Sequence, residues 1–346
     1  MNKKNEKNLK TIPVDEAAGT VLMHDITRII PGKEKGPAFK KGHIVKPENI
    51  ETLKDMGKEN LYAFEVSPDK YHENDAAEKF KSLAGKNISI EGPSEGKIVF
   101  KAKDDGLIKI DKETVNRINK IGDIALTTLH TDVPVKKGGD VAGMRAIPLV
   151  VDRKKVDRAL ETASGKNTVE IKPYKNKKIG LLVTGEEVAS GRIEDGFKPV
   201  IEKKVKEYGS RIVRYKLTGD RPENIKNQIL KSVERGCNFI ILTGGMSVDP
   251  DDKTKKAIID AGVRIVRYGV PVLPGNMFMV GYLDKIPVFG VPACALFHNI
   301  TVLDIYLPYA FSDTKITGDR LTKRGYGGYC RHCEVCVYPR CALGKF

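Results

Sequence analysis

The stretch IILTGGMSVDPDD, residues 240–252, joins an apolar run to two glycines, a serine and three aspartates. Glycine lets a backbone adopt positive φ angles and approach a ligand closely. Backbone amides at the start of a following helix can hold an anion, but neighbouring carboxylates would repel that anion unless a cation lay between them. Carboxylate oxygens are the ligands that Mg²⁺ prefers. The pattern therefore predicts a site for an anionic group held by amides and magnesium together.

A structural interpretation explains the same residues equally well. Gly244 and Gly245 would make a turn, and the aspartates would cap the helix expected at 251–262, because negative charge is favoured at a helix start. The glycines are not followed by the GK[ST] of a phosphate-binding P-loop. Both interpretations stay open on the residue types alone.

A second group of reactive residues lies at the end of the chain. Four of the six cysteines fall within YCRHCEVCVYPRCALGKF with the spacing C-x₂-C-x₂-C-x₄-C, and they are Cys330, Cys333, Cys336 and Cys341. This spacing is close to that of bacterial iron–sulfur ligands, with a longer final gap, whereas four thiolates also suit tetrahedral zinc. We expect a metal centre and not disulfides, because no signal peptide indicates a disulfide-forming compartment. Of the two metal centres we favour an iron–sulfur cluster over Zn²⁺.

Alternating strands and helices must position the first group. Apolar strands are expected at 178–185, 211–218, 238–245, 263–270, 277–283 and 286–293. Amphipathic helices are expected at 197–209, 222–236, 251–262 and 294–311. Such alternation predicts an open, parallel-rich sheet with helices on both faces, whose ligands bind at the carboxyl ends of the strands. The segments VTGEE, LTGG, VPVLPGN and GVPACA should therefore meet at one edge.

The rest of the chain divides by composition into further units. We expect an N-terminal α+β segment at 1–66, a small β-rich domain resembling a barrel or sandwich at 67–152, the α/β domain at 177–312 and a cysteine-rich metal-binding tail at 313–346. Residues 153–175 read as a bridge.

Composition narrows the function classes. The 346 residues are 40% hydrophobic and 30% charged, with a formal net charge of +15. Scattered lysines are typical of a solvated surface, and a nucleic-acid-binding function would rest on charge alone. The longest apolar segment is interrupted by His298, Asn299 and Asp304 and does not suit a membrane span. We expect a cytoplasmic protein.

Residues 177–312 resemble the molybdopterin-binding domain shared by molybdopterin molybdenumtransferases and related adenylyltransferases. The resemblance lies in the ordered motifs VTGEE, GRIEDG, TGGMSVDPDD, LPGN and VFGVP. The family's acidic glycine motif has the form S/T-G-G-x-S-x-G-x-x-D, which is matched by Thr243, Gly244, Gly245, Ser247 and Asp252. The resemblance implies a three-layer α/β fold that holds the phosphate end of the pterin at the glycine turn.

The resemblance also implies roles for individual residues. Asp252 and Asp195 would be catalytic, and Asp252 with Glu186 would hold Mg²⁺. The remaining positions would bind the cofactor, and they are Thr184, Gly185, Glu186, Thr243, Gly244, Gly245, Ser247, Asp249, Pro274, Gly275, Asn276 and Cys294.

This sequence departs from the family pattern at three places. Asp249 stands where the family has glycine, Asn276 replaces the lysine of its P-G-K-P motif, and VPACA replaces a later L-P-G-N-P. The missing lysine removes a cation suited to a phosphate or molybdate oxyanion. Cys294, within VPACA, could offer a thiolate to molybdenum, or could be a small core residue.

The resemblance implies a transferase that inserts molybdate into adenylylated molybdopterin, commonly as a homodimer, in molybdenum cofactor biosynthesis. The alternative is a non-catalytic protein that carries or senses molybdopterin or helps to mature a molybdenum enzyme. In that case the cysteine tail would serve as a redox element or a docking site.

Overall fold

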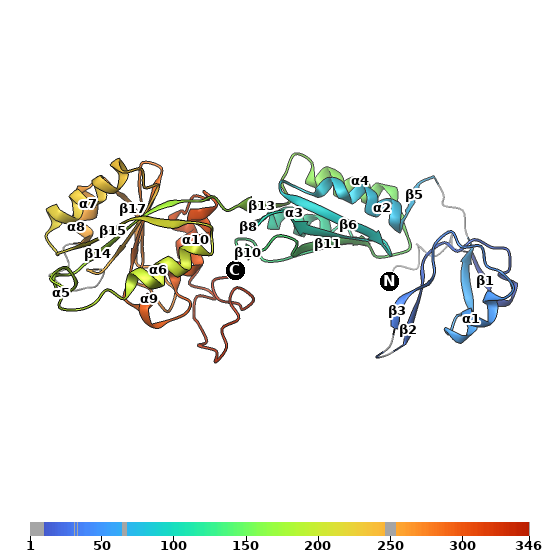
Figure 1. Cartoon of the computed structure of the whole chain (residues 1–346). Helices are drawn as coiled ribbons and strands as arrows, with labels where there is room; N and C mark the ends of the chain where they lie inside the picture. Colours follow the sequence, from blue (N-terminus) through green and yellow to red (C-terminus); the bar gives the residue numbers. More distant parts are fainter. Residues whose placement is uncertain (1–9, 31, 33, 64–67, 246–253, 346) are drawn as a thin grey trace.

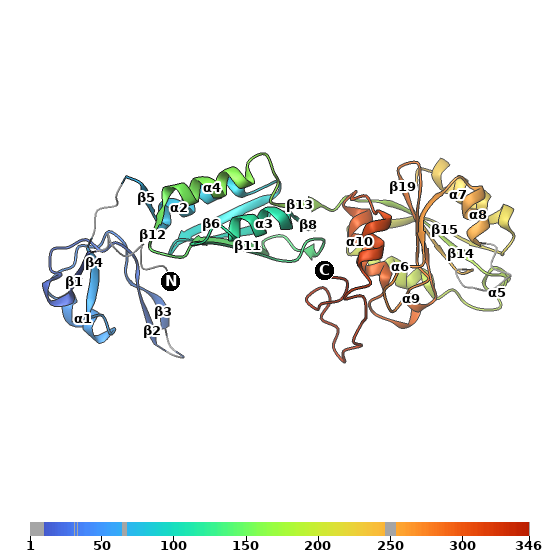
Figure 2. The same ribbon diagram turned by 180° about the vertical axis from the view of Figure 1, so that it is seen from behind.

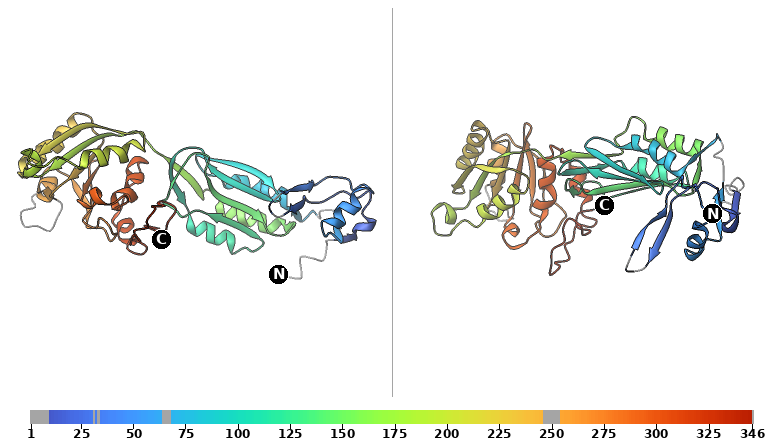
Figure 3. Two further views of the ribbon diagram at one scale, coloured as in Figure 1. Left: turned by 60° about the horizontal axis from the view of Figure 1, so that its bottom comes forward. Right: turned by 45° about the vertical axis from the view of Figure 1, so that its right-hand side comes forward.

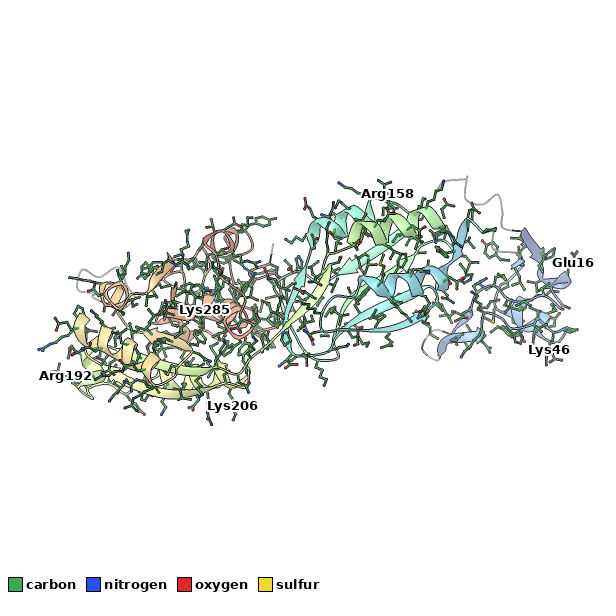
Figure 4. The ribbon with its side chains drawn as sticks, turned by 90° about the horizontal axis from the view of Figure 1, so that it is seen from above. Glu16, Lys46, Arg158, Arg192, Lys206 and Lys285 are labelled. Carbon is green, nitrogen blue, oxygen red and sulfur yellow. The ribbon has the colours of Figure 1, made fainter. Side chains whose placement is uncertain are left out.

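The computed structural model describes residues 10–30, 32, 34–63, 68–245 and 254–345. Three folded units follow one another in chain order along an elongated molecule, as the front and back views show (Figure 1 and Figure 2). Among the helices of the described residues, none is long and apolar enough to cross a membrane. Charged side chains such as Arg158, Arg192 and Lys206 point outward (Figure 4).

The N-terminal unit is a small α+β fold, as predicted. Its elements are β1 (Lys10–Pro13), η2 (Val14–Glu16), β2 (Ile26–Ile30), β3 (Glu34–Phe39), α1 (Asn49–Asp55) and β4 (Asn60–Ala63). Strand β1 pairs antiparallel with β4, and β2 pairs antiparallel with β3. Buried apolar residues including Val14, Leu22, Leu53 and Leu61 form its core.

The middle unit consists of two larger sheets, one further antiparallel pair of strands and three longer helices. Its elements are β5 (Lys70–His72), α2 (Glu73–Phe80), η3 (Lys81–Leu83), β6 (Ile88–Ser94), β7 (Lys97–Ala102), β8 (Gly106–Ile110), α3 (Lys112–Asn119), β9 (Ile124–Thr128), β10 (Pro134–Val135), β11 (Asp140–Ala146), β12 (Val150–Asp152), α4 (Arg153–Ala163) and β13 (Val169–Pro173). One antiparallel sheet has the order β6-β7-β11-β9, and the other has the order β10-β8-β13.

This unit differs from the expected barrel or sandwich because its main sheet is covered by helices. Strand β7 buries alternate residues, Ile98, Phe100 and Ala102, which leaves one apolar face to be covered. Helices α2, α3 and α4 supply that cover and share the same core (Figure 1). The segment expected to be a bridge therefore belongs to this unit, because α4 packs in its core and β13 pairs with β8.

His72 connects the middle unit to the N-terminal one. Its Nε2–H donates to the Met23 carbonyl oxygen, and its Nδ1 accepts from the Asn74 backbone N–H at the start of α2. Both bonds together need the neutral ring, and burial, with Lys41 nearby, lowers the pKa of His72 below its ordinary value of 6.5.

A lowered folded-state pKa gives stability that is present above the unfolded pKa and is lost as pH falls through the folded one. We therefore expect the native chain to lose thermal stability more steeply from about pH 7 to about pH 5 than His72→Gln does. Calorimetry of both proteins across this range tests the prediction, and parallel pH profiles would contradict it.

The C-terminal unit is the predicted three-layer α/β domain. Its elements are β14 (Lys178–Thr184), α5 (Glu186–Ala189), α6 (Phe197–Lys206), β15 (Arg211–Thr218), α7 (Pro222–Glu234), β16 (Phe239–Thr243), α8 (Thr254–Asp260), β17 (Arg264–Tyr268), β18 (Met279–Leu283), β19 (Ile286–Val291), α9 (Cys294–Phe297), α10 (Val302–Phe311) and α11 (Gly318–Lys323). The sheet has the order β15-β14-β16-β19-β18-β17.

Four neighbouring strands of this sheet, β15, β14, β16 and β19, run parallel, and β18 runs antiparallel to both β19 and β17. Successive residues of one strand face opposite layers. Leu181 packs in the cluster that contains residues of α6 and α10, while Leu182 packs with residues of α7 and α8. Burial on both faces explains why the strands are nearly continuous apolar runs.

Candidate functional site

The carboxyl ends of the parallel strands form the candidate site. Strands β14, β15 and β16 end at Thr184, Thr218 and Thr243, which are all buried. The Gly185 N–H donates to the Thr218 carbonyl oxygen at 3.1 Å, and Thr184 Oγ1 donates to the Thr243 carbonyl oxygen at 3.2 Å. These bonds fix the three strand ends against one another, so the loops that leave them start from defined positions.

The glycine turn after β16 lies directly against the end of β14. Gly244 has φ +81°, and a Cβ atom placed on it would lie 2.0 Å from the Thr184 carbonyl oxygen. Gly245 follows with φ +54°. A side chain at Gly244 would both strain the backbone and collide with β14, so the close approach predicted from the sequence is present.

Thr243 contributes a buried hydroxyl at the end of β16. Its Oγ1 is buried and, among the described residues, has no hydrogen-bond partner. A buried polar group left unsatisfied costs about 1–3 kcal/mol. Since this hydroxyl lies at the end of β16, next to the glycine turn, it is well placed to bond a ligand held at that turn.

Two acidic residues from neighbouring loops meet at the same edge. The Glu186 N–H donates to Asp220 Oδ2 at 3.2 Å, and the Asp220 N–H donates to Glu186 Oε1 at 3.1 Å. Glu186 follows β14 and Asp220 follows β15, so the reciprocal bonds join the two loops. Carboxylate oxygens gathered in this way suit Mg²⁺. The pairing keeps Glu186 as a candidate ligand and adds Asp220 beside it.

Asp195 has a clear structural role. Its carboxylate accepts from the backbone N–H groups of Phe197 at 2.7 Å and Lys198 at 3.1 Å, at the start of α6. It also accepts from Tyr215 Oη at 2.8 Å, and burial together with this bond raises the pKa of Tyr215. The residue therefore caps a helix, and a catalytic role for Asp195 stays a prediction.

The Leu273–Asn276 segment lies elsewhere on the same edge. Its backbone contacts the start of α10, where the Val302 N–H donates to the Pro274 carbonyl oxygen at 3.1 Å. Gly275 has φ +106° and little space for a side chain, while Asn276 is exposed. In the strand order, β19 lies between β16, which the glycine turn follows, and β18, into which this segment leads.

The remaining predicted residues fall into two sets. Cys294 is partly buried and begins the short helix α9 just beyond β19, on the same edge. Ser247, Asp249 and Asp252 lie outside the described residues, as does the rest of the acidic turn. Their roles therefore stay predictions from the sequence.

The tail cysteines are all free thiols, and Cys330, Cys333, Cys336 and Cys341 line one cavity of about 300 Å³. In the part of the chain that the structure describes, no three His, Cys, Asp or Glu side chains are grouped closely enough to hold a metal ion. Either expected metal centre would thus require the thiols to close in around the cavity.

Comparison with known proteins assigns two segments of the chain. Residues 180–309 match the family described as "Probable molybdopterin binding domain", and residues 11–65 match a "Domain of unknown function (DUF8806)". The first match confirms the resemblance seen in the ordered motifs.

Individual relatives cover only parts of the chain. The CinA-like proteins of Mycobacterium tuberculosis and Mycobacterium avium are 33% identical over 79 residues, which are 23% of this chain. The chain spans 18% of the length of those relatives. The crystal structure of the molybdopterin biosynthesis enzyme MoaB of Thermus thermophilus is 19% identical and covers 41% of this chain and 98% of its own, with a TM-score of 0.33. The Mog protein of Mycobacterium ulcerans is 17% identical, and the match covers 40% of this chain and 99% of the Mog chain, with a TM-score of 0.33.

Proposed function

We propose that this chain, whose residues 180–309 match the molybdopterin-binding family, binds molybdopterin at the carboxyl edge of its parallel sheet. The observation that carries the proposal is the glycine turn, whose Gly244 leaves no room for a side chain against Thr184. Backbone amides in such a turn can hold the phosphate end of the pterin. The buried Thr243 hydroxyl, which has no partner among the described residues, adds a bond beside them.

The acidic residues near this turn fit a magnesium ion bound with the pterin. Glu186 and Asp220 already bring two carboxylates together, and Asp252 is the further ligand proposed from the motif. Mg²⁺ would neutralise phosphate charge and polarise its oxygens. The chain's own part is to hold these carboxylates by the reciprocal backbone bonds between the loops after β14 and β15.

For the reaction, we propose insertion of molybdate into adenylylated molybdopterin. The departure at Asn276 bears most directly on this step, because the family's lysine would supply a positive charge to an oxyanion. Asn276 is exposed beside the structured Pro274–Gly275 turn, so an amide takes the place of that charge. This difference favours the alternative, a chain that binds molybdopterin as a carrier, a sensor or a maturation factor without completing the transfer.

The test supplies the full chain with adenylylated molybdopterin, Mg²⁺ and molybdate, and reads the product by reconstituting a cofactor-free molybdenum enzyme. We expect activity that Asp252→Ala reduces at least about tenfold, since losing the carboxylate proposed to bind Mg²⁺ should cost about 1.4 kcal/mol or more. Asp260→Ala serves as the matched control, because it removes a carboxylate from the exposed side of α8.

Other outcomes of the assay separate the two functions. Tight pterin binding without cofactor formation would make the chain a carrier or sensor, and transfer that appears only with Asn276→Lys would assign the defect to the missing charge. No binding of molybdopterin would contradict both functions.

A further inference from the structure

The tail that follows α11 forms a closed loop against the C-terminal unit (Figure 3). At its base the Gly344 N–H donates to the Gly327 carbonyl oxygen at 2.8 Å. On one side the Cys330 N–H donates to the Leu273 carbonyl oxygen at 2.9 Å, and the Leu273 N–H donates to the Gly328 carbonyl oxygen at 2.8 Å. The loop is therefore anchored to the segment that leads into Pro274, and its ends are fixed.

Between these anchors, residues 331–337 are exposed, while Tyr338, Cys341 and Leu343 pack against the core of the α/β domain. Residues 330–345, all of them described, contain no helix or strand. Ordering each residue costs about 1–2 kcal/mol of backbone entropy, and loops of this length without regular structure are uncommon unless they serve a function. Exposed apolar side chains such as Val335 add no core of their own. A ligand bound by the exposed residues 331–337 would offset part of the cost of ordering them.

The four cysteines are arranged around a shared space. Together with His298 and His332, whose rings lie 5.3 Å apart, they line the cavity of about 300 Å³. Two of them, Cys330 and Cys341, also pack against the core of the α/β domain, while Cys333 and Cys336 are exposed. The cavity is thus bounded on one side by the domain and on the other by the outer turn of the loop.

This geometry distinguishes two kinds of thiolate site. Zinc needs its four ligands about 2.0–2.3 Å from a single point. Among the described residues no three metal-binding side chains are grouped that closely, whereas all four cysteines line one cavity. A polynuclear cluster fills such a volume, and each of its irons takes a thiolate from a different direction. Arg331 also lines the cavity, where its charge would offset part of the negative charge of the thiolates.

We propose that Cys330, Cys333, Cys336 and Cys341 ligate an iron–sulfur cluster in this cavity. Each thiol gives up its proton as its sulfur bonds to iron, and the bound cluster offsets part of the cost of ordering the loop. The site is separate from the glycine turn and can be tested without molybdopterin. The proposal therefore does not depend on the proposed function.

The experiment measures iron, acid-labile sulfide and zinc in the full chain purified without oxygen. We expect iron and sulfide in equal amounts, about four of each per chain for a cubane cluster, with a brown protein and visible absorbance bands. Cys333→Ser and Cys336→Ser should each lower both contents by at least about half. Val335→Ser replaces an exposed side chain of the same loop and should leave the iron and sulfide contents unchanged.

The exposed positions of Cys333 and Cys336 keep the test independent of folding, and far-ultraviolet circular dichroism should be the same for all four proteins. Zinc at one per chain without sulfide would overturn the proposal, as would a protein that holds neither metal after reconstitution with iron and sulfide. Iron content that survives both serine changes would also overturn it.

Discussion

The substitution Gly244→Ala is expected to abolish ligand binding and to destabilise the α/β domain. The new Cβ would lie 2.0 Å from the Thr184 carbonyl oxygen and 2.9 Å from Thr184 Oγ1, at a backbone φ of +81°. The left-handed conformation alone costs about 1–2 kcal/mol, and forced overpacking adds about 1–3 kcal/mol. Since both strand ends are buried, the turn must move to relieve the contact.

Gly236→Ala is the matched control for this prediction. Gly236 has φ +77° at the end of α7, and nothing lies within 4 Å of the position of its Cβ. It should therefore show only the conformational cost of about 1–2 kcal/mol and bind the pterin normally. Calorimetric unfolding and titration with molybdopterin separate the two effects. Native affinity in the Gly244→Ala protein would show that the turn does not form the binding site.

The α/β framework could be predicted because its signals are local. Each parallel strand is a short apolar run that ends in threonine or valine, and each helix between them shows its own periodicity. The same logic could have found Asp220, because Thr218–Gly219–Asp220 repeats the pattern of Thr184–Gly185–Glu186 at the end of the next strand. Periodicity could also have found α4, whose Val156, Ala159 and Ala163 form one buried stripe.

Other features depend on contacts between distant parts of the chain. The pairing of Tyr329 with Leu273 attaches the cysteine tail to the segment before Pro274, and no pattern within either stretch specifies its partner. The capping role of Asp195 similarly depends on Tyr215 in the following strand. A motif fixes which residue types occur together, whereas tertiary packing decides which of them face a ligand and which stabilise a helix.

The junction between the middle unit and the α/β domain is a further feature that sequence patterns did not reveal. Asp132, whose side chain is 4% exposed, pairs with Lys109 of its own unit and accepts from Arg320 Nη1 of α11 at 2.6 Å. Tyr309 of α10 lies beneath both cations, and Arg324 donates to its hydroxyl. One carboxylate therefore balances a group of positive charges at this junction, of which Arg324 is buried and Lys109 and Arg320 are partly exposed.

Asp132→Ala should cost about 3–5 kcal/mol, because it leaves uncompensated charge in a buried place. Burial already lowers the pKa of Lys109, and Asp132 opposes that shift. Without Asp132 the folded-state pKa of Lys109 falls further below its ordinary value of 10.5. A lysine whose folded-state pKa is lowered destabilises the fold at neutral pH, and this effect disappears as pH rises toward the pKa of the unfolded state. The difference in unfolding free energy between Asp132→Ala and the native chain should therefore shrink from neutral to alkaline pH.

Two further variants separate charge from other effects at this junction. Asp132→Asn removes the charge but keeps a residue that tolerates the observed φ of +62°. It should lose most of the unfolding free energy that Asp132→Ala loses. Asp319→Ala breaks an exposed pair with Lys323 and should cost at most about 1 kcal/mol. Calorimetry should show one transition in the native chain splitting into two in Asp132→Ala, because the two units lose their shared charge network. A single transition with unchanged midpoint would mean that Asp132 does not couple them.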